Sequence, residues 1–345
     1  MQDNNTQKND SQKDGSNDDE RGGNNGTGQG GKGNNDTIDL TDIAGADDVD
    51  LDLGAAQDGV VIAQIDNNGD DTVDETVEID VDEDDDITVI GTDGDNVFAG
   101  GAGDDVIVGS AGDDAVTGGD GDDTIDYSDL NAGVTISSAG VIDKGDLGTD
   151  TVGEFDVEAG TIEVVETVVA NEDQTNVVDS TSVQGAVAID IDLDEGTFIG
   201  NIVENAGDFQ AGEFFAVTLE NFDDVLGSDN DDQITGDGQA NLLTGAAGTD
   251  IINGASGNDT INGGTGSDTL TGGDGEDTFV FALADGADTI TDFDVGADVL
   301  EFADFAASDV TTSTEGGDTT LSYGDSELVL EGVVEEDLSG LLMIA

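Results

Sequence analysis

The chain contains a nine-residue sequence that recurs in register in two separate arrays. Four copies begin at Gly91, Gly100, Gly109 and Gly118, and six begin at Gly227, Gly236, Gly245, Gly254, Gly263 and Gly272. Each copy starts with glycine, has Asp or Asn at position six and has an apolar residue at position eight. Because one apolar side chain per nine residues cannot form a core alone, successive copies must stack on one another.

Positions seven to nine of each copy predict a very short strand whose central residue points inward. The residues at position eight are Phe98, Ile107, Val116 and Ile125 in the first array, and Ile234, Leu243, Ile252, Ile261, Leu270 and Phe279 in the second. Two copies per coil would give a flattened solenoid of parallel strands, with turns along both edges and a thin apolar interior. The predicted fold is therefore all-β, a parallel β-roll or β-solenoid.

Stacking brings the position-six carboxylates close together and thereby indicates a ligand. Parallel coils lie about 4.8 Å apart, and two like charges at that distance repel by roughly 1 kcal/mol in water and about 3 kcal/mol at an effective dielectric of 20. A cation between the coils would remove this penalty. Glycines at positions one, two and four allow tight turns that direct carbonyl oxygens into the loop. Oxygen ligands without nitrogen or sulfur favour Ca²⁺ over Zn²⁺ or Cu²⁺.

The repeat resembles the G-G-x-G-x-D-x-U-x nonapeptide of the RTX family, the hemolysin-type calcium-binding repeat, which forms a calcium-binding parallel β-helix. The resemblance places the ligand Asp at Asp105, Asp114, Asp123, Asp232, Asp250, Asp259, Asp268 and Asp277. It places the ligand glycines at Gly101, Gly103, Gly112, Gly119, Gly121, Gly257, Gly264, Gly266, Gly273 and Gly275. The chain departs from the pattern at Asn96 and Asn241, which replace Asp, and at Gln239, which replaces a turn glycine.

Composition limits the partners of the chain. The net charge is −79, and Lys144 is the only cationic residue beyond the first 36 residues. Nucleic acid and anionic lipid are excluded as direct partners, because their phosphate groups would repel such a chain. Outside the arrays, the excess of carboxylates is also typical of a salt-adapted surface. A flexible glycine-rich linker would not keep the nine-residue register.

The arrays divide the chain into segments. Residues 1–36 are polar and predict disorder. The remaining expected segments are an acidic β-rich stretch at 37–90, the first array at 91–126, a β-rich spacer at 127–226, the second array at 227–280 and a C-terminal cap with a secretion signal at 281–345. The loop that begins at Asp66 partly resembles an EF-hand, but Asp71 stands at the glycine position and Val77 at the position of the last ligand, which favours an acidic turn.

The C-terminal segment resembles the sequences that close RTX arrays in secreted proteins. Its large apolar residues Phe279, Phe281, Phe293 and Leu300 would cover the open end of the solenoid. Asp288, Asp292 and Asp298 are either ligands of a terminal ion or ordinary surface acids. The uncharged residues 341–345, which follow an acidic cluster, resemble an uncleaved signal for type I secretion. No apolar run is long enough to cross a bilayer, and we expect no N-terminal signal peptide.

These features predict a secreted calcium-binding protein with a structural, adhesive, cell-surface or matrix role. We expect about two calcium sites in the first array and about four in the second, each adding roughly 1.4 kcal/mol at tenfold excess of calcium over its Kd. Expected partners are calcium, a type I exporter and a surface or matrix polysaccharide, without membrane insertion. The chain has no His and no Cys, which excludes the familiar catalytic triads and zinc sites. The alternative is a carboxylate-dependent enzyme that acts on polysaccharides through residues 127–226.

Overall fold

The repeats form short strands that alternate between two sheets. The computed structural model describes residues 36–40, 48–52, 60–66, 75–80, 86–137, 141–152, 154–156, 161–163, 167–181, 187–202, 214–303, 310–334 and 342–344. The chain divides into two units. Unit 1 comprises residues 1–134, 140–156 and 161–174, and unit 2 comprises 135–139, 157–160 and 175–345. Among the described residues the regular structure is β, apart from short 3₁₀ turns.

Unit 1 contains two sheets of mainly parallel strands. The first consists of β1 (Asp36–Asp39), β5 (Ile87–Ile90), β7 (Val106–Val108), β9 (Thr124–Asp126) and β15 (Thr167–Val169), all parallel. The second contains the parallel strands β2 (Asp48–Asp52), β6 (Val97–Ala102), β8 (Ala115–Asp120) and β12 (Thr149–Val152). Antiparallel neighbours are β3 (Val60–Asp66) and β4 (Glu75–Asp80) beside β2, and β11 (Val141–Asp143) beside β12. The 3₁₀ turn η3 (Gly145–Leu147) joins β11 to β12, and β13 (Glu154–Asp156) and β14 (Thr161–Glu163) form a hairpin.

Unit 2 has the same arrangement of strands. One sheet contains the parallel strands β17 (Val187–Asp192), β21 (Gln233–Thr235), β24 (Ile251–Asn253), β27 (Thr269–Thr271), β29 (Ala287–Ile290) and β33 (Ser326–Leu330). The antiparallel strands β18 (Thr197–Ile202) and β19 (Phe214–Glu220) follow beside β17, and β32 (Asp318–Tyr323) and β31 (Val310–Glu315) follow beside β33.

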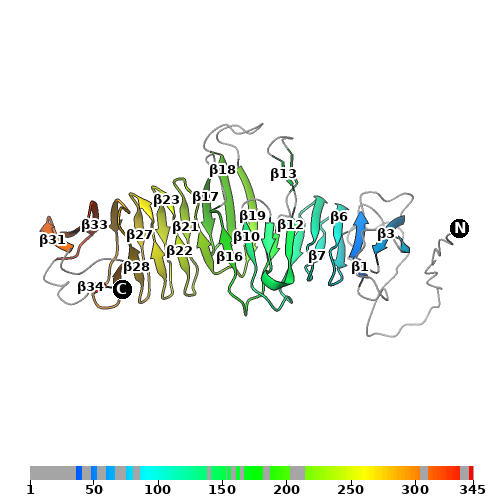
Figure 1. Cartoon of the computed structure of the whole chain (residues 1–345), viewed down its shortest axis with the longest axis horizontal. Coiled ribbons are helices and arrows are strands. Elements are labelled where there is room, and N and C mark those ends of the chain that lie inside the picture. Colours follow the sequence, from blue (N-terminus) through cyan, green and yellow to red (C-terminus); the bar gives the residue numbers. More distant parts are fainter. Residues whose placement is uncertain are drawn as a thin grey trace. The chain divides into compact units, whose positions relative to one another are not determined.

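The other sheet of unit 2 is parallel throughout. It consists of β10 (Thr135–Ser137), β16 (Val177–Asp179), β20 (Asp224–Leu226), β22 (Leu242–Thr244), β25 (Thr260–Asn262), β28 (Thr278–Phe281), β30 (Val299–Phe302) and β34 (Leu342–Ile344). The short strands β23 (Ala247–Gly248) and β26 (Thr265–Gly266) pair within the turns. Figure 1 shows β21, β22, β27 and β28 as short arrows in successive coils.

The core is a ladder of position-eight side chains, as the sequence predicted. Residues 18 apart are paired across neighbouring strands, as in Phe98 with Val116 and Ile252 with Leu270. All ten position-eight residues of the two arrays are buried. A separation of 18 residues means that one coil contains two nine-residue copies. The parallel β-roll with two copies per coil is therefore confirmed.

The same ladder continues outside the arrays. In unit 1, Leu51 pairs with Phe98 and Val168 with Ile125. In unit 2, Val178 pairs with Val225, and Leu300 pairs with Phe279. The spacer and the C-terminal segment thus contribute further parallel strands, although their sequences do not keep the nine-residue register.

The C-terminal part of unit 2 adds aromatic packing to the coils. The predicted cap residues Phe279, Phe281, Phe293 and Leu300 are all buried. The Phe281 ring centroid lies 5.7 Å from that of Phe302, which lies 5.1 Å from that of Tyr323. Because Tyr323 belongs to the antiparallel strand β32, this cluster ties the last parallel strands to the antiparallel ones. Residues 1–35 and 335–341, most of the EF-hand-like loop and the end of the predicted secretion signal lie outside the described residues.

Candidate calcium sites

The position-six side chains form hydrogen-bonded ladders along the edges of both units. In each step, the Oδ1 atom of one carboxylate accepts the backbone N–H of the position-six residue one coil earlier. The N–H of Asp105 donates to Asp123 at 2.9 Å, that of Asp250 to Asp268 at 2.9 Å, and that of Asp259 to Asp277 at 3.0 Å. These bonds fix the direction of the side chain, so the second carboxylate oxygen has a defined place.

The second carboxylate oxygen is buried without a hydrogen-bond partner at many of these positions. This holds for the Oδ2 atoms of Asp105, Asp250, Asp259, Asp268 and Asp277. A buried carboxylate oxygen without a partner is costly, because folding removes it from water and gives nothing in return. Five such oxygens at equivalent places in the repeat indicate a common ligand, and negatively charged oxygens favour a cation.

Carbonyl oxygens face the same space. A Cβ atom added to Gly254 would lie 2.4 Å from Asp259 Oδ2 and 2.6 Å from the carbonyl oxygen of Gly272, one coil further on. At Gly245 the matching distances are 2.3 Å to Asp250 Oδ2 and 2.6 Å to the Gly263 carbonyl. The carboxylate oxygen and the carbonyl oxygen are therefore at most about 5 Å apart, a span that an ion with Ca–O distances of about 2.3–2.6 Å can bridge.

The glycines at positions two and four shape the turns. All of the predicted ligand glycines except Gly275 have positive φ, with values from 87° at Gly264 to 156° at Gly266. They also lie against the preceding coil: a Cβ on Gly112 would be 2.3 Å from the Gly94 carbonyl oxygen, and one on Gly275 would be 1.6 Å from that of Gly257. Glycine is thus required both for the turn and for the close stacking of successive coils.

Burial and mutual repulsion make these carboxylates weak acids in the absence of a cation. Burial raises the pKa of Asp250 to about 8, and the charges of Asp268 and Asp232 add to the rise. Burial likewise raises the pKa of Asp105 to about 6, with Asp123 adding to it, and the pKa of Asp259 to about 6. The N–H groups that donate to the same carboxylates offset part of each rise. A bound cation would reverse this effect, because it favours the charged form.

The donor set determines which cation fits. Within the part of the chain that the structure describes, no three acidic side chains converge on one point to hold a metal. Each site must therefore combine carboxylate and backbone carbonyl oxygens from adjacent coils. A site built only from oxygen suits a hard cation of high coordination number, which fits Ca²⁺.

Two of the predicted ligands differ from the others, because their Oδ2 atoms have hydrogen-bond partners. At Asp232 this oxygen accepts the N–H of Ser228 at 2.7 Å and lies 3.0 Å from the Ser228 hydroxyl. At Asp114 it contacts the Ser110 hydroxyl at 3.2 Å and the ammonium of Lys144 at 3.3 Å.

The sequence analysis missed three members of the Asp ladders. The N–H of Asp114 donates to Asp150 at 2.9 Å, although these residues are 36 apart rather than 18. In unit 2, the N–H of Asp268 donates to Asp288 and that of Asp277 to Asp298, each at 3.1 Å. Asp288 and Asp298, expected as terminal ligands or surface acids, therefore continue the ladders into the C-terminal segment. Asp292 instead accepts the N–H groups of Gly272 and Gly273.

Asp150 belongs to an additional nine-residue copy within the spacer. Residues 145–153 have Gly145 at position one, Gly148 at position four, Asp150 at position six and Val152 at position eight. Val152 pairs with Val116, which holds position eight of the copy that begins at Gly109. Gly148 has a φ of 114° and lies against the Gly112 carbonyl, as a position-four glycine should. The pattern was visible in the sequence, because Gly145 lies 27 residues, or three copies, after Gly118 and so keeps the register of the first array. It stands alone, because no matching copy lies between them.

One protein-family model matches the nine-residue repeats. The family model described as RTX calcium-binding nonapeptide repeat (4 copies) matches residues 90–125, 226–261 and 254–290. The comparison with curated proteins found no match. Among solved structures, the extracellular lipase LipA from Serratia marcescens is 20% identical over 75% of this chain and 40% of its own, with a TM-score of 0.31. The chain thus spans less than half the length of that lipase.

Two further solved structures are subunits of a mannuronan C5-epimerase from Azotobacter vinelandii. The AlgE6R3 subunit is 30% identical over 35% of this chain and 80% of its own, with a TM-score of 0.27. The AlgE6R2 subunit is 30% identical over 34% of this chain and 91% of its own, also with a TM-score of 0.27. Together with the stacked nine-residue copies, the family match at 90–125 and 226–290 shows that the repeat segments of this chain belong to the RTX calcium-binding nonapeptide repeat family, whose repeats bind calcium ions.

Proposed function

We propose that this is a secreted calcium-binding RTX protein whose arrays fold when they meet extracellular Ca²⁺, and that its role is structural rather than enzymatic. The observation that carries the proposal is the row of buried Oδ2 atoms without hydrogen-bond partners at Asp105, Asp250, Asp259, Asp268 and Asp277. These oxygens recur at the same position of the repeat, and those of Asp105, Asp250 and Asp259 face carbonyl oxygens of the next coil.

The proposed ligands are the position-six carboxylates and the carbonyl oxygens of the turn glycines. The carboxylates are Asp105, Asp123, Asp250, Asp259, Asp268 and Asp277, and the ladder adds Asp288 and Asp298 as further candidates. The carbonyl ligands are those of the position-two and position-four glycines that the resemblance implies, together with position-one carbonyls such as those of Gly263 and Gly272, which face the Oδ2 atoms. Each ion would then link two successive coils, because its carboxylate and carbonyl ligands come from both.

Calcium would decide whether the arrays are folded. Without it, carboxylates in adjacent coils repel by about 1–3 kcal/mol per pair, while each copy buries only one large apolar side chain. With calcium at tenfold excess over Kd, each site adds about 1.4 kcal/mol. Several sites together approach the total stability of an ordinary domain, about 5–15 kcal/mol. A protein built in this way stays open where calcium is scarce and closes where calcium is abundant.

Calcium-dependent folding also supports secretion and a role at the cell surface or in a matrix. Folding controlled by calcium suits a chain that is exported unfolded, as by a type I exporter, and folds outside the cell. The acidic exterior suits a calcium-rich extracellular layer, including one that contains polysaccharide. Among the described residues, no helix is long and apolar enough to cross a membrane.

Two of the spacer acids that the structure describes accept backbone N–H groups of neighbouring coils. Asp150 accepts the N–H of Asp114, and Asp224 accepts the N–H of Leu242 at 2.7 Å. These contacts give the acids a structural role, whereas the alternative function requires a carboxylate pair that is available to a polysaccharide substrate. We therefore favour the non-enzymatic function.

A calcium titration of the full chain followed by circular dichroism tests the proposal. In calcium-free buffer we expect low β-structure, which rises cooperatively as calcium reaches the millimolar range. Mg²⁺ at the same concentration is the control, and it should have little effect because it demands near-ideal octahedral geometry and loses water reluctantly. If the β-structure were equally strong with and without calcium, the proposal would be wrong. Turnover of a polysaccharide by the folded protein would contradict the non-enzymatic role.

A further inference from the structure

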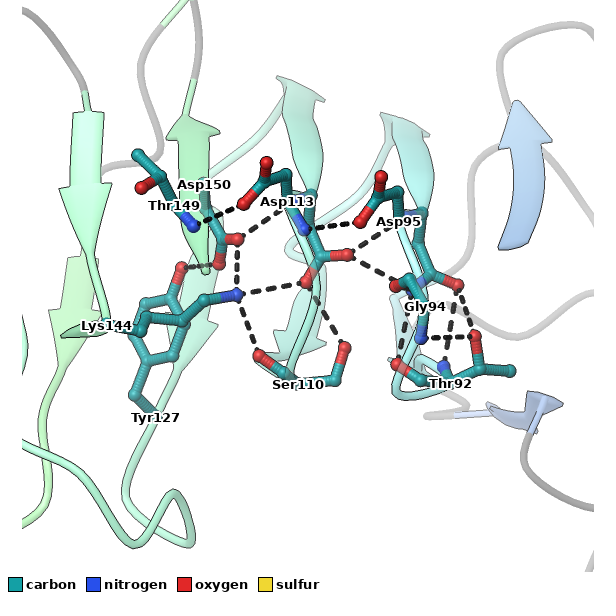
Figure 2. A network of polar contacts seen from close by, with 11 residues as sticks. Thr92, Gly94, Asp95, Ser110, Asp113, Tyr127, Lys144, Thr149 and Asp150 are labelled. Atoms are coloured by element: carbon teal, nitrogen blue, oxygen red, sulfur yellow. Dashed lines mark hydrogen bonds and ion pairs between the residues drawn. The ribbon is translucent and has the colours of Figure 1, made fainter. Parts of the chain in front are cut away.

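The copies that begin at Gly109 and Gly145 are joined by a buried lysine. Lys144 immediately precedes Gly145, and its side chain is 0% exposed. Its ammonium donates to the Ser110 carbonyl oxygen at 2.7 Å, lies 3.3 Å from Asp114 Oδ2 and forms an ion pair with Asp150 Oδ1. Figure 2 shows the Lys144 ammonium at the centre of these contacts. We call Ser110, Asp114, Tyr127, Lys144 and Asp150 the lysine site.

The ligands of this ammonium are of the same kind as those proposed for calcium. Ser110 is at position two of its copy, and Asp114 and Asp150 are the position-six carboxylates of two successive coils. At equivalent places, such as Asp105 and Asp259, the Oδ2 atom has no hydrogen-bond partner. At Asp114 the Oδ2 atom contacts Lys144 and Ser110. The positive charge therefore lies at the place that a bound cation would take elsewhere in the repeats.

A nitrogen donor takes a similar place one coil earlier. The side-chain Nδ2 of Asn96 donates to the carbonyl oxygens of Thr92 and Gly94, at positions two and four of the same copy. It also donates to Asp114 Oδ1, the position-six carboxylate of the next coil, at 3.1 Å. An amide group and an ammonium thus contact position-two carbonyl oxygens and position-six carboxylates at neighbouring steps of one ladder. Both replace, with N–H donors, the contacts that a bound cation would make.

The aromatic ring of Tyr127 fills the remaining space at the lysine site. A Cβ atom on Gly109 would lie 2.2 Å from the Tyr127 ring. A Cβ atom on Gly100, Gly245 or Gly254 would instead lie beside the position-six Oδ2 atom. The Tyr127 hydroxyl donates to Asp150 Oδ2 at 2.5 Å. Both oxygens of Asp150 and both oxygens of Asp114 consequently have donors.

From these contacts we infer that Lys144 is a built-in substitute for a calcium ion: its ammonium occupies the cation position of this site, so that the Asn96–Asp114–Asp150 edge of unit 1 is held without calcium. Removing the ammonium leaves Asp114 and Asp150 together, with the Ser110 carbonyl beside them and no positive charge. That set of oxygens is the one proposed to bind calcium in the rest of the arrays. Replacing Lys144 with a neutral residue should therefore create a new calcium site.

Lys144→Met in the full chain tests this inference. Methionine keeps most of the length of the side chain and removes its charge. Isothermal titration calorimetry should show one more calcium ion bound per chain than in the wild type. The matched control is Lys32→Met, which removes the same charge far from the repeats in sequence and should leave the calcium stoichiometry unchanged. A folded Lys144→Met protein that binds only as much calcium as the wild type would overturn the inference.

Terbium luminescence can locate the added ion. Tb³⁺ binds at oxygen-rich calcium sites and emits when a nearby tyrosine is excited, and Tyr127 already touches Asp150. Lys144→Met should gain tyrosine-sensitised emission, and the gain should disappear in the double variant Lys144→Met, Tyr127→Phe. Added emission that persists without Tyr127 would place the ion elsewhere and contradict the inference.

If Lys144→Met does not fold at any calcium concentration, hydrogen exchange of the wild type decides. At the lowest calcium concentration at which the arrays fold, the N–H of Asp114 should exchange at least ~10-fold more slowly than that of Asp105, which belongs to the opposite edge. Equal exchange at both edges would overturn the inference. The inference rests on the proposed calcium ligands, but the two can fail separately. If those ligands are wrong, the wild type does not bind calcium at the arrays, whereas failure of this inference leaves wild-type binding intact.

Discussion

The two edges of unit 1 carry the same backbone turns but different side-chain chemistry. One edge, which we call the lysine edge, has Asn96, Asp114 and Asp150 at position six, with N–H donors from Asn96 and Lys144 on their oxygens. The other, the carboxylate edge, has Asp105 and Asp123, and Asp105 Oδ2 is buried without a hydrogen-bond partner. Asn96, Asp105, Asp114 and Asp123 alternate between the two edges along the chain, within one continuous run of coils. A different fold therefore cannot explain the difference in polar contacts.

This contrast separates two requirements of the repeat, which are the stacking of coils and the neutralisation of the position-six carboxylates. Stacking requires glycines and one apolar residue per copy, and both edges meet that requirement through Phe98, Ile107, Val116 and Ile125. Neutralising the carboxylates requires positive charge or N–H donors, and at the lysine edge Lys144 and Asn96 supply them. The Oδ2 atoms of Asp105, Asp250, Asp259, Asp268 and Asp277 have no such donor, so we expect their positive charge to come from solution. The repeat sequence therefore specifies the fold, while the source of the cation can vary from site to site.

The largest expected effect is that of pH in calcium-free buffer. Burial raises the pKa of Asp250 to about 8, of Asp288 to about 7, and of Asp105 and Asp259 to about 6. Because the folded carboxyl groups bind protons more tightly than the unfolded chain does, protonation stabilises the calcium-free fold. That stability is fully present below the ordinary pKa of 3.8 and is lost as the pH rises through about 6 to 8.

Circular dichroism of the calcium-free protein between pH 5 and pH 8 would measure this effect. We expect more β-structure at the acid end and its loss on going to pH 8, with recovery when calcium is added at pH 8. Calcium should also bind more weakly at low pH, since protons compete for the same oxygens. β-structure that increased with pH in the absence of calcium would refute the role of the buried carboxylates.

The next effect in size is the loss of the lysine. Removing one partner of a buried ion pair typically costs about 3–5 kcal/mol, because the remaining charge is buried without compensation. At the lowest calcium concentration at which the arrays fold, Lys144→Met should therefore destabilise unit 1 by about that amount, and saturating calcium should restore most of the loss. Urea unfolding followed by Tyr127 fluorescence in a Tyr323→Phe background reports on this unit alone. Equal losses at low and at saturating calcium would mean that calcium does not take the place of the ammonium.

Much of this contrast could not be read from the sequence. The nine-residue register predicted the parallel β-roll, the buried ladder and the carboxylate rows, because each copy repeats the same local turn and strand. The lysine site depends on an insertion: the chain leaves the register after residue 126 and returns at Gly145, so Asp150 follows Asp114 by 36 residues. Spacing alone could not show that β11 and η3 place Lys144 over Asp114. Asp288 and Asp298 were likewise hidden by spacings of 20 and 21 residues from the preceding ladder members.

A smaller effect is expected from filling the space beside a position-one glycine in the second array. Gly254→Ala would place a methyl group 2.4 Å from Asp259 Oδ2 and 2.6 Å from the Gly272 carbonyl oxygen. We expect a loss of about 1–3 kcal/mol in the presence of calcium, as for other overpacked sites, together with weaker calcium binding. The matched control is Gly238→Ala, because a Cβ atom there has nothing within 4 Å. Thermal unfolding of both variants in calcium would show the difference, and equal melting temperatures would argue against a cation space beside Gly254.

The smallest effect is expected when the lysine edge is given a carboxylate at its first step. This change is also the most direct test of the contrast between the two edges. Asn96→Asp removes the amide that donates to Thr92 O and to Asp114 Oδ1 and adds a negative charge beside Asp114. Without calcium the new pair of charges should cost about 1–3 kcal/mol. With calcium the variant should bind one more ion than the wild type, since its carboxylate and carbonyl oxygens then match those of the carboxylate edge. Asn131→Asp, at an exposed residue of the same unit, is the control for the added charge. We expect calorimetry to show added calcium for Asn96→Asp but not for Asn131→Asp. That result would establish that the N–H donors, rather than the shape of the turn, keep calcium from this edge. Added calcium in neither variant would contradict that explanation.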